Sequence, residues 1–153
     1  MEEDRIQKAV ELFKSGYNCS QSVVAAFADM YGFTQEQALR MGASFGGGIG
    51  RMRETCGAAC GMFLVAGLET GATEATDREG KAANYAVVQE LAAEFKKRNG
   101  SLICAELLGL KKKEPISTVP EERNTQYYSK RPCAKMVEEA ARIWVEYLEK
   151  HPK

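Results

Sequence analysis

The sequence predicts an all-α fold: one domain over residues 1–153, built as a helical bundle of about six to seven helices with one long crossover loop. Apolar residues recur at helical spacing along most of the chain, and capping residues and glycines mark helix ends. No run of alternating β-branched residues competes with this pattern. A chain of 153 residues that is 44% hydrophobic is large enough to bury a core of its own.

Capping signals predict where the early helices start. Asn18 followed by Gln21 has the spacing of a capping box, and Thr34 followed by Gln37 repeats it. Gly16 ends the helix before the first of these boxes. The expected helices cover residues 4–15, 19–31, 35–45, 55–70, 77–98, 101–110 and 132–150.

The later helices differ in character. The helix over residues 55–70 is rich in glycine and alanine, so its intrinsic propensity is poor and we expect close packing to bury it. The helix over residues 77–98 carries an apolar face that includes Tyr85 and Phe95. Ser101 is the expected cap of the short sixth helix, and Pro132 suits the first turn of the last one.

One long connection, residues 111–131, interrupts this pattern. A structureless segment of that length is uncommon in a compact domain, and it is usually functional or a crossover. It contains a lysine run at 111–113, which we interpret as solvated. Tyr127 and Tyr128 either cover a site or pack against the bundle.

The balance of charge narrows the classes of partner. Twenty-one basic residues oppose twenty-one acidic ones, so no net field attracts nucleic acid or an anionic membrane. The longest apolar run, residues 62–68, is far too short for a transmembrane segment. The acidic start of the chain is unlike a secretory signal, so we expect a cytoplasmic protein whose cysteines are reactive, metal-binding or buried thiols.

Four of the five cysteines fall at the starts of predicted helices: Cys19, Cys56, Cys104 and Cys133. Free backbone N–H groups and the helix dipole stabilise a thiolate there, which lowers the pKa of the thiol. Successive antiparallel helices would place three of these starts at one end of the bundle, and the long connection would bring Cys133 back to that end. The hypothesis is one site formed by four helix starts.

A glycine-rich turn, residues 46–50, precedes Cys56. Its backbone can adopt positive φ and approach a ligand closely. The alternative is a helix C-cap followed by a tight turn into the next helix. Arg51 and Arg53 either stabilise a thiolate at Cys56 or bind an anion, or are surface charges without a function. With the glycine turn and the helix start, the two arginines make Cys56 the expected most activated thiolate of the set. The residues we expect to form a cofactor-binding or anion-binding wall are Gly47, Gly48, Gly50 and Arg51.

The order of these cysteines, with Cys56-Gly57-Ala58-Ala59-Cys60-Gly61 between the first and the third, resembles the redox-active protein family named for its C_GCAxxG_C_C pattern. Other segments that match the family are residues 18–23, 45–50, 104–109 and 132–133. The motif here reads Cys-Gly-Ala-x-x-Gly, so Cys60 is an extra thiol beyond the four of the pattern. The resemblance implies redox chemistry without naming a reaction.

Three classes of function remain, and a thiol redox protein acting through Cys19, Cys56, Cys104 and Cys133 is the one we favour. Such a protein would be a thiol oxidoreductase with a redox partner that the sequence does not identify. The alternative is a zinc or iron–sulfur protein with the same four cysteines as ligands and Cys60 as a further one, although their spacing is not the usual CxxC. The third is a helical module whose cysteines pack.

Two further expectations limit the site and the assembly. His151 is the only histidine and lies near the carboxyl end of the chain, which argues against a Cys–His dyad and against histidine metal ligands. The sequence does not decide between a monomer and a homo-oligomer.

Overall fold

The computed structural model describes residues 2–110, 117–124, 127 and 132–152. Over these residues the fold is all-α, with seven α-helices, two short 3-10 helices and no strand. The α-helices are α1 (Glu2–Lys14), α2 (Cys19–Phe27), α3 (Gln35–Gly42), α4 (Gly57–Thr70), α5 (Arg78–Asn99), α6 (Cys104–Leu107) and α8 (Cys133–Lys150). The 3-10 helices are η1 (Ala28–Tyr31) and η2 (Ala43–Phe45). The predicted fold class is confirmed.

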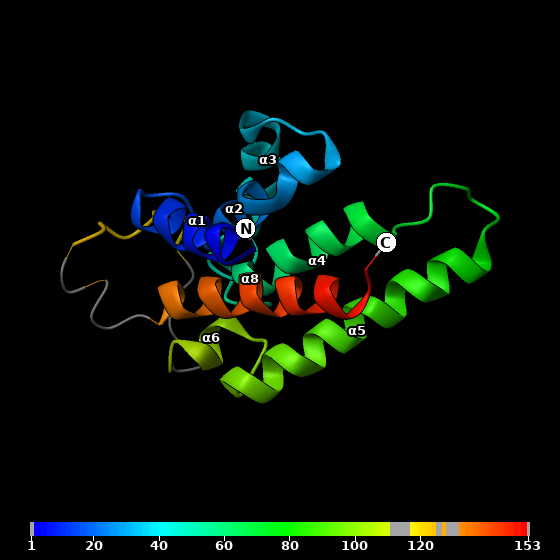
Figure 1. Ribbon diagram of the computed structural model, residues 1–153. Helices are drawn as coiled ribbons and strands as arrows, with labels where there is room; N and C mark the ends of the chain where they lie inside the picture. The colour runs from blue at the N-terminus through cyan, green and yellow to red at the C-terminus, as the bar shows by residue number, and fades with distance from the viewer. Residues whose placement is uncertain (1, 111–116, 125–126, 128–131, 153) are drawn as a thin grey trace.

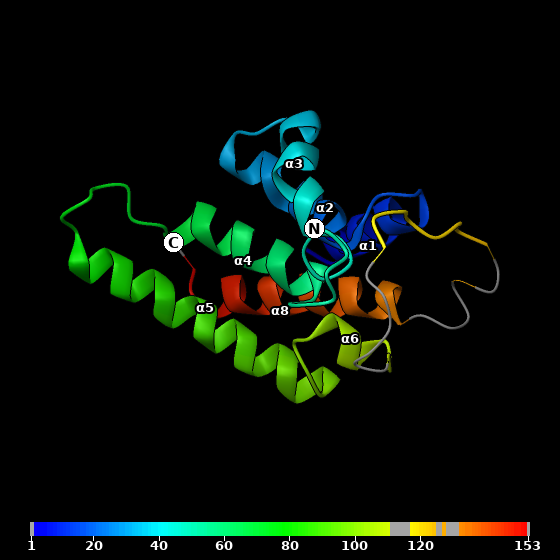
Figure 2. The same ribbon diagram turned by 180° about the vertical axis from the view of Figure 1, so that it is seen from behind.

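Helices α2, α4 and α8 contact one another and form the centre of the bundle, with α1 packed on α2 and α8 and α5 packed on α4 and α8. Figure 1 shows α4 and α8 running in the same direction and α5 running back against them. Figure 2 views the molecule from behind, and there the connection between η2 and α4 lies on the side nearer the viewer. The starts of α4, α6 and α8 therefore gather at one end of the bundle.

The core of the bundle is apolar and closely packed. Trp144 of α8, Phe13 of α1, Phe27 of α2 and Phe95 of α5 are fully buried. Helix α4 is held in this core as predicted, because small residues let α2 approach it. A Cβ added to Gly61 would lie 2.9 Å from the carbonyl oxygen of Ser20.

Both predicted capping boxes are present, at Asn18 before α2 and at Thr34 before α3. The predicted cap of the sixth helix is wrong. Helix α6 is a single turn that starts at Cys104, and the Ser101 hydroxyl instead accepts from Ile103 N at 2.9 Å and donates to Glu106 at 2.8 Å.

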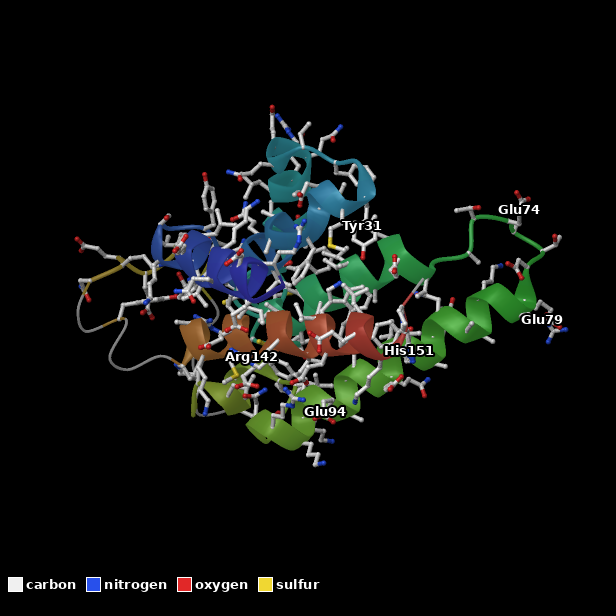
Figure 3. The ribbon with its side chains drawn as sticks, viewed as in Figure 1. Tyr31, Glu74, Glu79, Glu94, Arg142 and His151 are labelled. Atoms are coloured by element: carbon white, nitrogen blue, oxygen red, sulfur yellow. The ribbon has the colours of Figure 1, made fainter. Side chains whose placement is uncertain are left out.

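The predicted burial of Tyr85 is also wrong, because this side chain is 61% exposed. The first half of α5 extends beyond the body of the bundle together with the 71–77 connection, and Figure 3 shows Glu74 and Glu79 pointing away from the protein there. Among the described residues, no helix combines the length and the apolar character that spanning a membrane requires.

Candidate functional site

Four cysteines line one pocket at the end of the bundle where helices begin. Cys19, Cys104 and Cys133 are the first residues of α2, α6 and α8, and Cys56 is the N-cap of α4. The pocket has a cavity volume of about 100 Å³. Its remaining walls are mostly apolar and include Leu107, Leu108, Pro120, Tyr127, Pro132 and Met136. The structure thus brings together the four cysteines at predicted helix starts.

The glycine loop, residues 46–56, forms one side of this site and contains several residues with a positive φ. Gly47, Gly48 and Gly50 have φ values of 66°, 79° and 57°, and Ile49 between them also has a positive φ of 65°. Hydrogen bonds close wide turns within the loop, including Glu54 N to Gly48 O at 2.9 Å. The segment is therefore more than a helix C-cap and a tight turn. Glycine is needed here because most side chains disfavour positive φ.

The end of the glycine loop pairs with the residues before α6. Thr55 and Ile103 form an isolated antiparallel bridge, flanked by hydrogen bonds from Cys56 N to Leu102 O and from Cys104 N to Glu54 O, both 2.6 Å long. This pairing fixes Cys56 and Cys104 on neighbouring segments. A Cβ added to Gly48 would lie 2.6 Å from Cys104 Cβ, so the loop touches this cysteine where glycine allows it.

Cys19 lies against the start of α4 and beside Cys133. A Cβ added to Gly57 would lie 3.3 Å from Cys19 Cβ, so glycine brings these two helix starts close. The interaction with the Cys133 side chain is the largest cause of the raised pKa of Cys19, which places the two side chains beside each other. Cys56 and Cys104 are also close enough to Cys19 to influence its ionisation, which shows that the four sulfurs form one electrostatic cluster.

The pKa values of two pocket thiols move in the direction opposite to the one predicted. The hydrogen bond with Cys133, then burial, then the charges of the neighbouring cysteines raise the pKa of Cys19 well above its ordinary value. Burial raises the pKa of Cys56 to about 12, although the N–H groups of Ala59 and Ala58 act in the expected, lowering direction. Desolvation of the thiolate outweighs the helix start, so Cys56 is a neutral thiol at pH 7.

The two arginines near Cys56 serve other groups. Arg53 donates to the sulfur of Cys104, with 3.6 Å between Nη1 and Sγ. Arg51 lines the pocket and donates to the carbonyl oxygens of Ser117, at 2.7 Å, and Val119. The expected activation of Cys56 by these arginines is therefore wrong, because the pairing with α6 directs Arg53 towards Cys104.

The described part of the long connection covers the pocket. Pro120, Glu121 and Tyr127 contribute to its wall. Arg123 fastens this segment to α1 and the turn after it, with hydrogen bonds to Phe13 O at 2.6 Å and Tyr17 O at 2.8 Å. This role of Arg123 could not be predicted from the sequence, because a lone arginine in a polar segment gives no signal of such a contact. Tyr128 and the lysine run at 111–113 lie outside the described residues.

Cys60 and His151 lie apart from the cysteine pocket. Cys60 is buried in α4, does not line the pocket, and donates to Thr55 O with a separation of 3.8 Å. Burial raises its pKa to about 11. His151 stacks on Tyr147 after the end of α8, and Figure 3 shows it at the end opposite to the start of that helix, where Cys133 lies.

A metal centre needs its ligands to converge on one point. Within the described parts of the chain, no three histidine, cysteine, aspartate or glutamate side chains are arranged to hold one ion. Four thiols are nevertheless the right kind of ligand for zinc or an iron–sulfur cluster. Cys19, Cys56, Cys104 and Cys133 would have to move closer together to bind either, and Cys60 lies outside the pocket.

The fold is an all-α bundle, and its pocket is lined by four cysteines from four helix starts. These two features define the class of protein: an all-α protein with a cysteine-lined pocket. The family model described as Putative redox-active protein (C_GCAxxG_C_C) matches residues 17–147, and the chain belongs to this family. Neither a curated protein nor a solved structure matches the chain.

Proposed function

We propose that this protein is a thiol oxidoreductase that exchanges its pocket thiols with a disulfide substrate. The observation that carries the proposal is the cluster itself: four cysteines from four segments line one pocket, and the interaction with Cys133 is the largest influence on the pKa of Cys19. The two sulfurs would approach each other to the ~2.05 Å of a disulfide bond. We assign Cys19 and Cys133 as the pair that closes the stable disulfide.

The reaction balances without a cofactor. Two protein thiols reduce one substrate disulfide, so the protein gains one S–S bond and the substrate leaves as two thiols that carry the two protons. In the reverse direction a dithiol partner restores the protein thiols. The substrate is a disulfide and the partner a dithiol by chemical class.

The apolar surroundings support this chemistry. Because burial raises the pKa of Cys56 and contributes to the raised pKa of Cys19, these two thiols are neutral at rest. A disulfide is also neutral, so oxidation of neutral thiols adds no charge to the pocket. A zinc ion bound by four thiolates would instead leave a net negative charge there, which apolar walls disfavour.

The glycine loop has a supporting role in the proposal. Gly47 and Arg51 line the pocket, so they form the part of the loop that a bound substrate would contact. Gly48 and Gly50 are not pocket-lining residues, and we assign them to shaping the loop that carries the other two.

The test is a count of reactive thiols in anaerobically purified protein, before and after a small uncharged disulfide and again after a reductant. We expect the five thiols of the chain to fall to three on oxidation and to return to five on reduction. In Cys133→Ser the disulfide between Cys19 and Cys133 is absent from peptide maps of the oxidised chain, because Cys19 loses its partner. Cys60→Ala is the matched control and loses the same pair of thiols as the natural chain.

Two results would contradict the proposal. One is an unchanged thiol count after prolonged oxidation of folded protein. The other is zinc or iron that copurifies in stoichiometric amount and is lost on replacing Cys56 or Cys104 by serine, which would favour the cysteine-ligated metal centre instead.

A further inference from the structure

Arg53 donates a hydrogen bond to the sulfur of Cys104, one of the four pocket cysteines. Its guanidinium donates to Cys104 Sγ across 3.6 Å, and both residues line the cysteine pocket. A hydrogen bond from a cation to sulfur favours the thiolate over the thiol. Arg53 is half-buried, so water screens this interaction less than it would at the surface.

The glycine loop holds Arg53 against Cys104 in a conformation that costs energy. Arg53 has a φ of 62°, in the left-handed region that residues with a Cβ disfavour. Three contacts fix the loop to the start of α6: Cys104 N to Glu54 O at 2.6 Å, Ala105 N to Arg53 O at 3.3 Å, and the close approach of Gly48 to Cys104 Cβ. Strain at a functional site is kept when the surrounding contacts determine it.

Cys56 and Cys19 are poor candidates for the first attack, because the pKa of each thiol is raised. Burial raises the pKa of Cys56 to about 12, and the hydrogen bond with Cys133 helps to hold the proton on Cys19. The thiolate is the attacking species in disulfide exchange. The contact with Arg53 therefore favours Cys104, which lies against the loop, as the attacking thiolate.

We propose that Cys104 is the nucleophile that first attacks the substrate disulfide, and that Arg53 stabilises its thiolate. This rests on the proposed function. The Cys104 thiolate attacks one substrate sulfur, forms a mixed disulfide and expels the other substrate sulfur as a thiolate. A second pocket thiol then attacks Cys104 Sγ and loses its proton, which leaves an intramolecular disulfide and the second substrate thiol. Intramolecular exchange carries that disulfide to Cys19 and Cys133.

The experiment is acid-quenched mass spectrometry of the full chain with 2-hydroxyethyl disulfide as the probe, at several pH values. At the earliest times we expect the adduct on Cys104. In Arg53→Met we expect adduct formation at pH 7 to be about 10-fold slower and its pH profile to move up by about one unit, because the cation is lost. Arg53→Lys keeps the charge and restores most of the rate.

Arg40→Met is the matched control, because Arg40 is exposed on α3, pairs with Glu36 and lies outside the pocket. We expect its rate and pH profile to match those of the natural chain. If Arg53→Met does not fold by circular dichroism, Arg53→Gln removes the same charge and keeps a donor. A first adduct on another cysteine, or a folded Arg53 variant without charge that keeps the natural rate and profile, overturns the inference. Either result leaves the reversible thiol count intact, so it is distinct from failure of the proposed function.

Discussion

The helical core and the glycine loop are held together by different forces. The core of α1, α2, α4 and α8 is fixed by apolar side chains such as Phe13 and Trp144, which are fully buried. The glycine loop, residues 46–56, is fixed by backbone hydrogen bonds and positive φ values, with the pairing of Thr55 and Ile103 at its end. The core sets the direction of the helices, and the loop sets the surroundings of Cys104. We therefore expect substitutions in the core to change stability without changing which cysteine reacts first.

Truncating the core should have the largest effect on stability. Trp144→Ala removes a fully buried side chain from α8, and we expect it to lower the free energy of unfolding by about 3 to 5 kcal/mol. Urea unfolding measures this loss, and Trp144→Phe should cost less because it leaves a smaller cavity. If the core and the loop are separable, the adduct on Cys104 still forms first in the folded fraction. Loss of that preference would contradict the separation.

The loop should respond to a single methyl group. Gly48→Ala places a side chain at φ 79° and puts its Cβ 2.6 Å from Cys104 Cβ, so we expect a loss of about 2 to 4 kcal/mol from strain and overpacking together. Gly32→Ala is the control, because Gly32 has nearly the same φ, 83°, but no atom within 4 Å of an added Cβ. It should cost only the backbone strain, about 1 to 2 kcal/mol. Equal losses in the two variants would show that the loop does not press on Cys104.

Alkaline pH should weaken the fold through its buried thiols. The pKa of Cys56 is raised to about 12 in the folded protein, whereas an unfolded cysteine ionises near ~8.5, so the folded state retains a proton that the unfolded state releases. Stability therefore falls as pH rises between these values, by about 1.4 kcal/mol per pH unit for this thiol. Below about pH 8 the contribution is fully present.

Denaturant titrations at several pH values above 8 measure this slope. We expect Cys56→Ala to be less steep than the natural chain by about 1.4 kcal/mol per pH unit, because the linked proton is gone. Lysines and tyrosines that titrate in the same range contribute equally to the slopes of the natural chain and of Cys56→Ala, so the difference between the two slopes reports Cys56 alone. Equal slopes would mean that Cys56 is not desolvated.

Much of the core followed from local patterns in the sequence. Asn18 with Gln21 predicted the start of α2 through a capping box, and apolar spacing predicted the buried face of α5 that carries Phe95. Helix directions then predicted that four helix starts would meet, because loop lengths constrain which ends lie together. These are local signals, and they accumulate along the chain.

The thiol surroundings could not be predicted in the same way. The direction of the pKa shift at Cys56 depends on how completely other segments bury it, which no local pattern reports. The contact between Arg53 and Cys104 joins residues 51 positions apart and depends on left-handed residues that the propensities of arginine and isoleucine oppose. Ser101 was misassigned as a cap because the same hydroxyl also suits a turn that bonds Ile103.

Peptide mapping of the oxidised protein tests the central claim most directly. After one equivalent of a small disulfide, digestion at acidic pH and mass spectrometry without reductant should find a single crosslink that joins the Cys19 peptide to the Cys133 peptide, with Cys60 still a thiol. This result would show that the starts of α2 and α8 meet as a redox pair. A crosslink that includes Cys60, or one between two chains with none inside a chain, would contradict the account.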